Sequence, residues 1–71
     1  MHRQTVSSSA ISSVGYDERS AVLEVEFSSG SIYDYFGVTE RLFQSFLDSP
    51  SKGRFFAQRI RSRFPCEKAE A

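Results

Sequence analysis

Side chains able to carry nucleophilic, acid–base or metal chemistry are few in this sequence and widely separated. His2 is the only histidine and Cys66 the only cysteine of the 71 residues, and they stand near opposite ends of the chain. No serine lies in a Gly-x-Ser-x-Gly stretch, the sequence that exposes a nucleophilic serine on a sharp turn. Glu24 and Glu26 alternate with apolar residues, which is typical of the outer face of a strand. We therefore expect no catalytic residue, no metal site and no cofactor, and predict that the protein is not an enzyme.

Anion binding is the chemistry that the sequence favours instead, and it is predicted by the stretch SPSKGRFFAQRIRSRF. These residues, 49–64, are called the basic segment below, and they include no acidic residue. Clustered basic residues without intervening acids are typical of a surface that contacts phosphate groups. The alternative interpretation is a solvated face that the rest of the domain partly neutralises. The basic residues of the segment are Lys52, Arg54, Arg59, Arg61 and Arg63.

The basic segment stands out because the remainder of the chain has the opposite charge. Residues 1–48 contain three basic and seven acidic residues, although the formal net charge of the whole chain is zero. Such a distribution predicts a strongly dipolar molecule, a property that the net charge conceals. A positively charged surface on one side of the domain is therefore the first candidate for a binding site.

A more specific anion site is predicted where the basic segment becomes helical. If Ser51 caps the helix, the first backbone N–H groups point outward at the positive end of the helix dipole. Gly53 would let a ligand approach the backbone, and Lys52 would add a positive charge. The competing interpretation is an ordinary helix start, in which Gly53 allows close packing on the sheet. The two interpretations are compatible with each other.

Length and composition bound the class of protein. A chain of 71 residues predicts one small domain, and its seven Phe and three Tyr must supply much of the core. A single cysteine excludes an internal disulfide and suits a reducing compartment. The first ten residues lack the apolar stretch of a secretory signal, and no apolar run is long enough to span a bilayer. We expect a soluble, cytoplasmic protein that makes no membrane contact.

Three strands are predicted in the first half of the chain. Apolar residues within the serine-rich start predict a strand over residues 10–16. The run AVLEVEF, residues 21–27, alternates between apolar and acidic residues, the pattern of a half-buried strand. Gly30 then permits a tight turn, and residues 31–36 form the third strand. Two strands joined so closely must pair in antiparallel fashion.

Tyr33 and Tyr35 share one face of the third strand, and the length of the preceding turn decides which face that is. A three-residue turn pairs Val25 with Tyr33 and places both tyrosines in the core. A two-residue turn pairs Glu26 with Tyr33 and exposes the rings as a platform for stacking nucleic acid bases. We favour the core, because Glu24 and Glu26 would repel phosphate groups beside an exposed platform.

Two helices are predicted in the second half of the chain. Thr39 is a suitable N-cap for a helix over residues 39–48, in which apolar residues recur at helical spacing. Pro50 disfavours helical geometry at the preceding residue and so ends this helix. A second helix is predicted over residues 52–63, with its apolar positions facing the sheet and its arginines facing outward.

The predicted order of elements is β-β-β-α-α. Strands followed by helices indicate an α+β fold, here a three-stranded antiparallel meander with two helices packed on one face. We assign residues 5–64 to a single domain. Residues 65–71 begin with proline and lack apolar periodicity, so we expect a disordered C-terminal tail.

Several short motifs stand in a distinctive order along this domain. Tyr33-Asp34-Tyr35 is preceded by Leu23-x-Val25-x-Phe27 and followed by Ser51-Lys52-Gly53. The remaining motifs are Ser8-Ser9, Ile11, Gly15-Tyr16-Asp17, Gly30, Val38, Phe56 and Ile60-Arg61. Together they resemble the KTSC domain, which is named for the C-terminal domain of some lysyl-tRNA synthetases and also occurs as a stand-alone bacterial protein. The resemblance implies a bacterial module, and the association with synthetases implies RNA as a partner.

Our leading hypothesis from the sequence is a small binding module that engages RNA or tRNA through its basic second helix. The alternative is a protein-interaction module whose basic helix docks on an acidic partner protein. RNA binding predicts strong salt dependence, whereas a protein partner predicts that apolar anchors such as Phe55 matter as much as the arginines.

Overall fold

The computed structural model describes residues 3–6 and 8–69 of the chain. His2 and the last two residues of the predicted tail therefore lie outside the described residues. Four strands come first: β1 (Arg3–Thr5), β2 (Ile11–Asp17), β3 (Val22–Phe27) and β4 (Ile32–Phe36). Two helices follow, α1 (Glu40–Asp48) and α2 (Lys52–Arg59), and the chain returns to the sheet as β5 (Cys66–Lys68).

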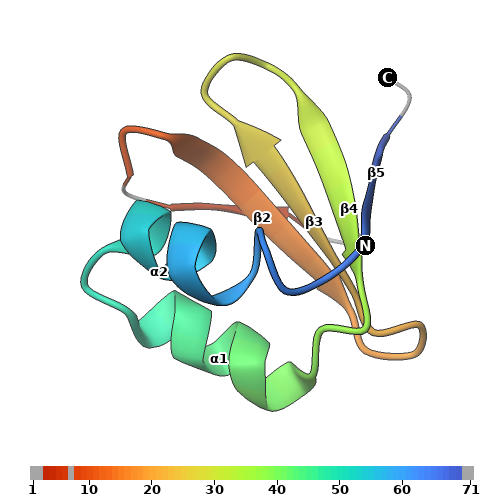
Figure 1. Cartoon of the computed structure of the whole chain (residues 1–71). Coiled ribbons are helices and arrows are strands. Elements are labelled where there is room, and N and C mark those ends of the chain that lie inside the picture. Colours follow the sequence, from red (N-terminus) through yellow and green to blue (C-terminus); the bar gives the residue numbers. More distant parts are fainter. Residues whose placement is uncertain (1–2, 7, 70–71) are drawn as a thin grey trace.

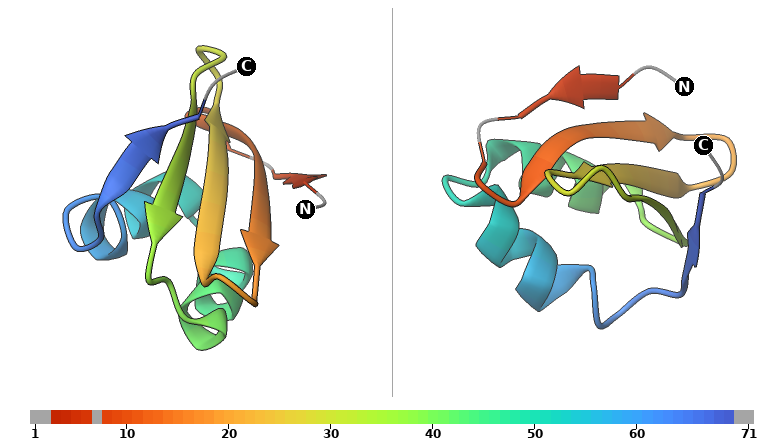
Figure 2. Two further views of the ribbon diagram at one scale, coloured as in Figure 1. Left: turned by 90° about the vertical axis from the view of Figure 1, so that its right-hand side faces the viewer. Right: turned by 90° about the horizontal axis from the view of Figure 1, so that it is seen from above.

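The strands form one antiparallel sheet in the order β1-β2-β3-β4-β5, and both helices lie against the same face of it (Figures 1 and 2). The predicted α+β fold with helices on one face is confirmed. The sheet contains five strands rather than three, because a short strand is added at each edge of the predicted meander. Neither helix of the described chain is long and apolar enough to cross a membrane.

The hairpin between β3 and β4 has the three-residue turn. Val25 pairs with Tyr33, and the Phe27 backbone N–H donates to the Ser31 carbonyl at 2.9 Å. Gly30 occupies the left-handed region with φ of 99°, which glycine adopts without the steric cost of a side chain. This register places the tyrosines of β4 on the same side of the sheet as the helices, so the predicted core position of this face is confirmed.

The turn between β2 and β3 differs from the prediction at Ala21. The alternating pattern placed Ala21 inside the strand, but β3 begins at Val22 and Ala21 lies in the turn with φ of 56°. The Ala21 carbonyl accepts hydrogen bonds from the backbone N–H groups of Gly37 and Val38, each at 3.0 Å. These two hydrogen bonds join the turn between β2 and β3 to the segment that links β4 to α1. Because the bonded residues are far apart in the sequence, the alternating pattern of residues 21–27 could not predict them.

The tail and the end of α2 also differ from the prediction. The helix ends at Arg59 rather than near residue 63, and residues 60–64 form turns in which the Arg61 N–H donates to the Phe56 carbonyl at 2.8 Å. The tail, expected to be disordered, forms β5 over residues 66–68, antiparallel to β4. The Pro65 carbonyl accepts a hydrogen bond from the Phe36 N–H at 2.9 Å, which brings the chain to the free edge of β4. The helix ends early because the chain must turn back to reach this edge.

The core between sheet and helices is rich in aromatic rings. Phe56 of α2 makes edge-to-face contacts with Tyr35, at 5.1 Å between ring centroids, and with Phe27, at 5.4 Å. Phe46 of α1 and Ile60 after α2 are fully buried. Edge-to-face pairs add to the stabilisation from burial, so Phe56 is the residue through which α2 is held to β3 and β4.

Candidate nucleic-acid interface

The five basic residues of the basic segment do not share one environment. Arg54, Arg59, Arg61 and Arg63 are exposed, whereas Lys52 is half-buried. The first three basic positions lie on α2, and the last two lie in the turns that follow it. The predicted single helical face is therefore replaced by basic residues that are divided between α2 and the turns of residues 60–63.

Lys52 has a structural contact of its own. Its Nζ donates a hydrogen bond of 2.6 Å to the Ser49 carbonyl, at the C-terminal cap of α1. The C-terminus of a helix carries partial negative charge, and α1 has no basic residue in its own last turn. Lys52 supplies that cation from the neighbouring helix, so its ammonium group is less available to a ligand than the arginines are.

Arg59 lies over an aromatic ring. Its guanidinium carbon is 5.4 Å from the centroid of Phe55, and the Phe55 ring in turn lies 5.8 Å from that of Phe46. Phe55 is a half-buried ring beneath Arg59 and so interrupts the row of charged side chains on α2. A guanidinium above a ring keeps its outward N–H groups available while the contact fixes its position.

The predicted anion site at residues 51–53 is only partly open. Ser51 stands at the N-cap of α2, but its side chain makes no capping hydrogen bond. Gly53 lies against the segment before β2, where an added Cβ would be 3.8 Å from Ala10 and from Ser8. Those distances are ordinary contacts, so a side chain would fit at this position, and close packing does not by itself require glycine there.

Tyr35 and Tyr33 differ in exposure. Tyr35 is buried with 3% of its surface exposed, and Tyr33 is half-buried at the rim, with its ring 5.9 Å from that of Phe27. Burial, with a smaller contribution from the neighbouring Cys66, raises the pKa of Tyr35 to about 12. The pair does not form an open stacking platform, and the base-stacking interpretation of this motif is wrong for Tyr35.

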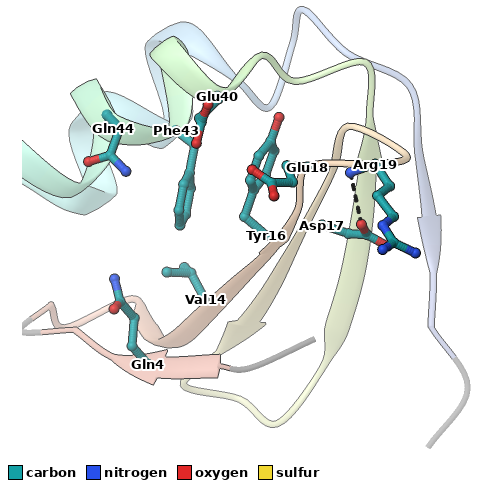
Figure 3. Close-up of a pocket in the computed structure, with 9 residues that line it drawn as sticks. All are labelled: Gln4, Val14, Tyr16, Asp17, Glu18, Arg19, Glu40, Phe43 and Gln44. Atoms are coloured by element: carbon teal, nitrogen blue, oxygen red, sulfur yellow. Dashed lines mark hydrogen bonds between the residues drawn. The ribbon is translucent and has the colours of Figure 1, made fainter.

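Two groups of acidic residues lie outside the basic segment, one on the sheet and one beside α1. On the face of the sheet opposite the helices, Glu24, Asp34 and Glu67 stand side by side on β3, β4 and β5. Other carboxylates line a groove between α1 and the β1–β2 edge (Figure 3), which the sequence did not predict. The residues that line the groove are far apart in the chain. Of the short motifs in the sequence, Gly15-Tyr16-Asp17 is the one that contributes to the groove.

Comparison with known proteins identifies the domain. A model of the KTSC domain matches residues 7–64. The chain is 45% identical over 58 residues to an uncharacterized protein of Stutzerimonas stutzeri, covering 82% of each chain. It is 35% identical over 60 residues to a lysine–tRNA ligase of Nostoc punctiforme, covering 84% of this chain but 11% of the ligase.

A solved structure agrees with this assignment. The crystal structure of a KTSC domain protein from Yersinia pestis superimposes with a TM-score of 0.94, shares 46% sequence identity and covers 97% of both chains. Agreement of sequence and fold over nearly the whole length confirms the resemblance drawn from the short motifs. The chain belongs to the KTSC domain family.

Proposed function

We propose that this protein is a non-enzymatic binding module that engages RNA through the arginines of the basic segment. The observation that carries the proposal is a set of four exposed arginines on and just after α2. Their contacts in the described part of the chain are to a backbone carbonyl, 3.4 Å from Arg63 to Gln58, and to the Phe55 ring beneath Arg59. No carboxylate is among these contacts, so the guanidinium groups keep their capacity to bind phosphate oxygens.

The relatives support this proposal in one respect. The lysine–tRNA ligases of Nostoc punctiforme and Trichormus variabilis each contain a region similar to this chain. The chain spans about a tenth of those ligases, 11% and 9% respectively, so it resembles an accessory part of proteins that act on tRNA. A module that binds RNA backbone is consistent with that setting.

A protein with an acidic surface is the second candidate, and the position of Phe55 favours it. A half-buried ring beside exposed arginines is a common anchor in protein interfaces, where aromatic and arginine residues contribute most of the affinity. The two candidates differ in what they require: RNA needs the charges, and a protein partner needs the Phe55 ring as well. Exchanging Phe55 for Leu while keeping all four arginines separates them.

Titration with single-stranded RNA and with tRNA at low salt, followed by amide NMR shifts, tests the proposal. We expect weak binding with shifts in residues 51–63. About three phosphate contacts from this surface predict that log K falls against log salt with a slope of about −2. The double variant R59E/R63E should lose binding, because both side chains are exposed and outside the core.

The matched control is R19E/R41E, which changes the net charge equally at two exposed arginines outside the basic segment. This variant should keep most of the RNA affinity. If RNA shifts no resonance in residues 51–63, or if both double variants lose affinity equally, the RNA proposal is wrong. If F55L loses binding to an acidic protein partner but keeps its affinity for RNA, the acidic protein becomes the favoured partner.

A further inference from the structure

A groove lies between α1 and the edge formed by β1 and β2, on a part of the molecule that contains no residue of the basic segment. It encloses about 500 Å³, a volume typical of small-molecule sites. Figure 3 shows its lining side chains coming from β1, β2, the β2–β3 turn and α1. The lining residues are Gln4, Val14, Tyr16, Asp17, Glu18, Arg19, Glu40, Phe43 and Gln44.

The apolar floor of the groove is rigid. Tyr16 stacks on Phe43 with 4.8 Å between ring centroids and an interplanar angle of 14°. The Tyr16 hydroxyl donates a hydrogen bond of 2.6 Å to the Val38 carbonyl, which fixes the ring from its far end. Val14 beside these rings is fully buried. This floor is suited to an aliphatic or flat apolar group, and it is preorganised because its members hold one another.

One end of the groove is acidic. Figure 3 shows the side chains of Glu18 and Glu40 at the end of the groove where the Tyr16 ring lies. Burial and, to a lesser extent, the charges of Glu40, Glu18 and Asp17 raise the pKa of the Tyr16 phenol. Arg19 is the one basic residue among the described residues that line the groove, and its side chain points away from Glu40, beside Asp17 (Figure 3). Among the described side chains that line this end of the groove, two carboxylates and a phenol oxygen lie together with no cation between them (Figure 3). These oxygens are hydrogen-bond acceptors of the kind that an ammonium group binds.

The other end of the groove is polar and neutral. Gln4 on β1 and Gln44 on α1 stand on its two walls (Figure 3), and each carboxamide can accept or donate a hydrogen bond. The groove therefore has an acidic end, an apolar floor and a neutral polar end. A ligand that matches this sequence of environments is an elongated chain with a cationic head, an aliphatic stem and a second polar group.

We propose that this groove binds a small linear organic cation of the diamine or polyamine class. One ammonium group is held between Glu18 and Glu40, the methylene chain lies along the half-buried rings of Tyr16 and Phe43, and the next nitrogen meets the carboxamides of Gln4 and Gln44. The proposal does not depend on RNA binding, because the groove and the basic segment share no residue.

Titration of the full chain with spermidine, followed by amide NMR shifts and isothermal titration calorimetry, tests this inference. Saturable shifts are expected in residues 14–19 and 40–44. Glu18 and Glu40 are exposed, so Glu18→Gln and Glu40→Gln should each lower the affinity about two- to fivefold, the range expected for exposed charge pairs. Asp48→Asn, an exposed carboxylate at the other end of α1, should leave the affinity unchanged.

Glutarate, which has a similar chain but opposite charge, should produce no shifts in the groove. Several results would overturn the inference. The first is that spermidine shifts the resonances of the outer sheet face around Glu24 and Asp34 instead of those of the groove. The second is that D48N loses as much affinity as the Glu18→Gln and Glu40→Gln variants. The third is that spermidine shows no saturable binding. The inference would also be wrong if a basic peptide shifted the resonances of residues 14–19 and 40–44 and spermidine did not, because the ligand would then not be a small cation.

Discussion

The two helices lie side by side on one sheet, yet they are built differently. In α1 the Thr39 hydroxyl oxygen accepts from the Leu42 N–H at 3.1 Å, and Glu40 supplies an acid in the first turn. In α2 the N-cap side chain makes no such bond, and the first turn carries Lys52 and Arg54 but no acid. Thus α1 satisfies the usual requirements of a helix start, and α2 does not.

This difference suggests what each helix is for. Positive side chains at a helix N-terminus face the positive end of the dipole and destabilise the helix slightly. The α2 helix tolerates them because Phe56 and Ile60, both buried, hold it on the sheet. A helix kept in place by packing, with unfavourable charge at its start, is stabilised further by a bound anion. The comparison therefore agrees with the proposed RNA-binding role of α2, while α1 serves the core and one wall of the groove.

The largest difference is expected between Phe46 of α1 and Phe55 of α2. Phe46 of α1 is fully buried, so Phe46→Ala should cost about 3–5 kcal/mol, which is enough to unfold a domain of this size. Phe55 of α2 is half-buried, and Phe55→Ala should cost about half as much. Circular dichroism on thermal unfolding measures both.

Phe46→Leu keeps the comparison measurable where Phe46→Ala fails to fold. This variant retains much of the volume and should fold with a lowered midpoint, whereas Phe55→Leu should shift the midpoint less. Equal shifts in the two leucine variants would show that Phe55 contributes as much to core packing as Phe46, contrary to the difference in their burial.

The N-caps provide a second test of the comparison, with an effect of about 1 kcal/mol. Thr39→Ala removes a side chain that accepts a hydrogen bond from the first turn of α1, and should lower the free energy of unfolding by that amount. Ser51→Ala is the matched change in α2 and should alter it by less than about 0.5 kcal/mol, because no such bond is present. Chemical denaturation of the two variants decides this, and a larger loss in S51A would contradict it.

Sequence patterns predicted those parts of the fold that depend on neighbouring residues. The alternation through Leu23, Val25 and Phe27, and the cap at Thr39, are local features, and the structure contains both. The two edge strands were missed because each has three residues and no alternation of its own. Their pairing depends on a free neighbouring edge, which only the assembled sheet provides.

The candidate sites show the same limit. The charge of the basic segment is visible in the sequence, but the contact of Lys52 with Ser49 and the early end of α2 are not. Both arise because the chain turns between the helices and then back to β4. The groove depends on bringing Gln4, Tyr16 and Glu40 together from three elements, so no local motif could have predicted its shape.

Alkaline pH should act on the tyrosines beneath each helix. The pKa of Tyr35, under α2, is raised by burial to about 12 from its ordinary value near 10. The folded state therefore favours the protonated phenol, so this contribution to stability is complete below pH 10 and is lost as the pH rises from about 10 to about 12. Tyr16, against α1, is shifted in the same direction.

Urea denaturation across this pH range measures the effect, with Tyr35→Phe and Tyr16→Phe as controls. The Tyr35→Phe variant should lose less stability between neutral and alkaline pH than the unmodified protein does. Tyr16→Phe should retain most of the decline, and it should also be less stable at neutral pH because the hydrogen bond to Val38 is lost. An unchanged pH profile in Tyr35→Phe would show that another group controls the alkaline transition.

The smallest predicted effect bears most directly on why α2 begins with cations. Arg54 is exposed in the first turn of α2, so Arg54→Glu replaces an unfavourable charge at the positive end of the dipole with a favourable one. We expect stability to rise by about 0.5 kcal/mol while RNA affinity falls. Arg41→Glu, in the first turn of α1, is the matched control, because it should stabilise by a similar amount and leave RNA affinity unchanged. A gain in stability for Arg54→Glu without loss of RNA binding would mean that the charge at the start of α2 is not retained for phosphate contact. Arg59, Arg61 and Arg63 would then carry the interaction without Arg54.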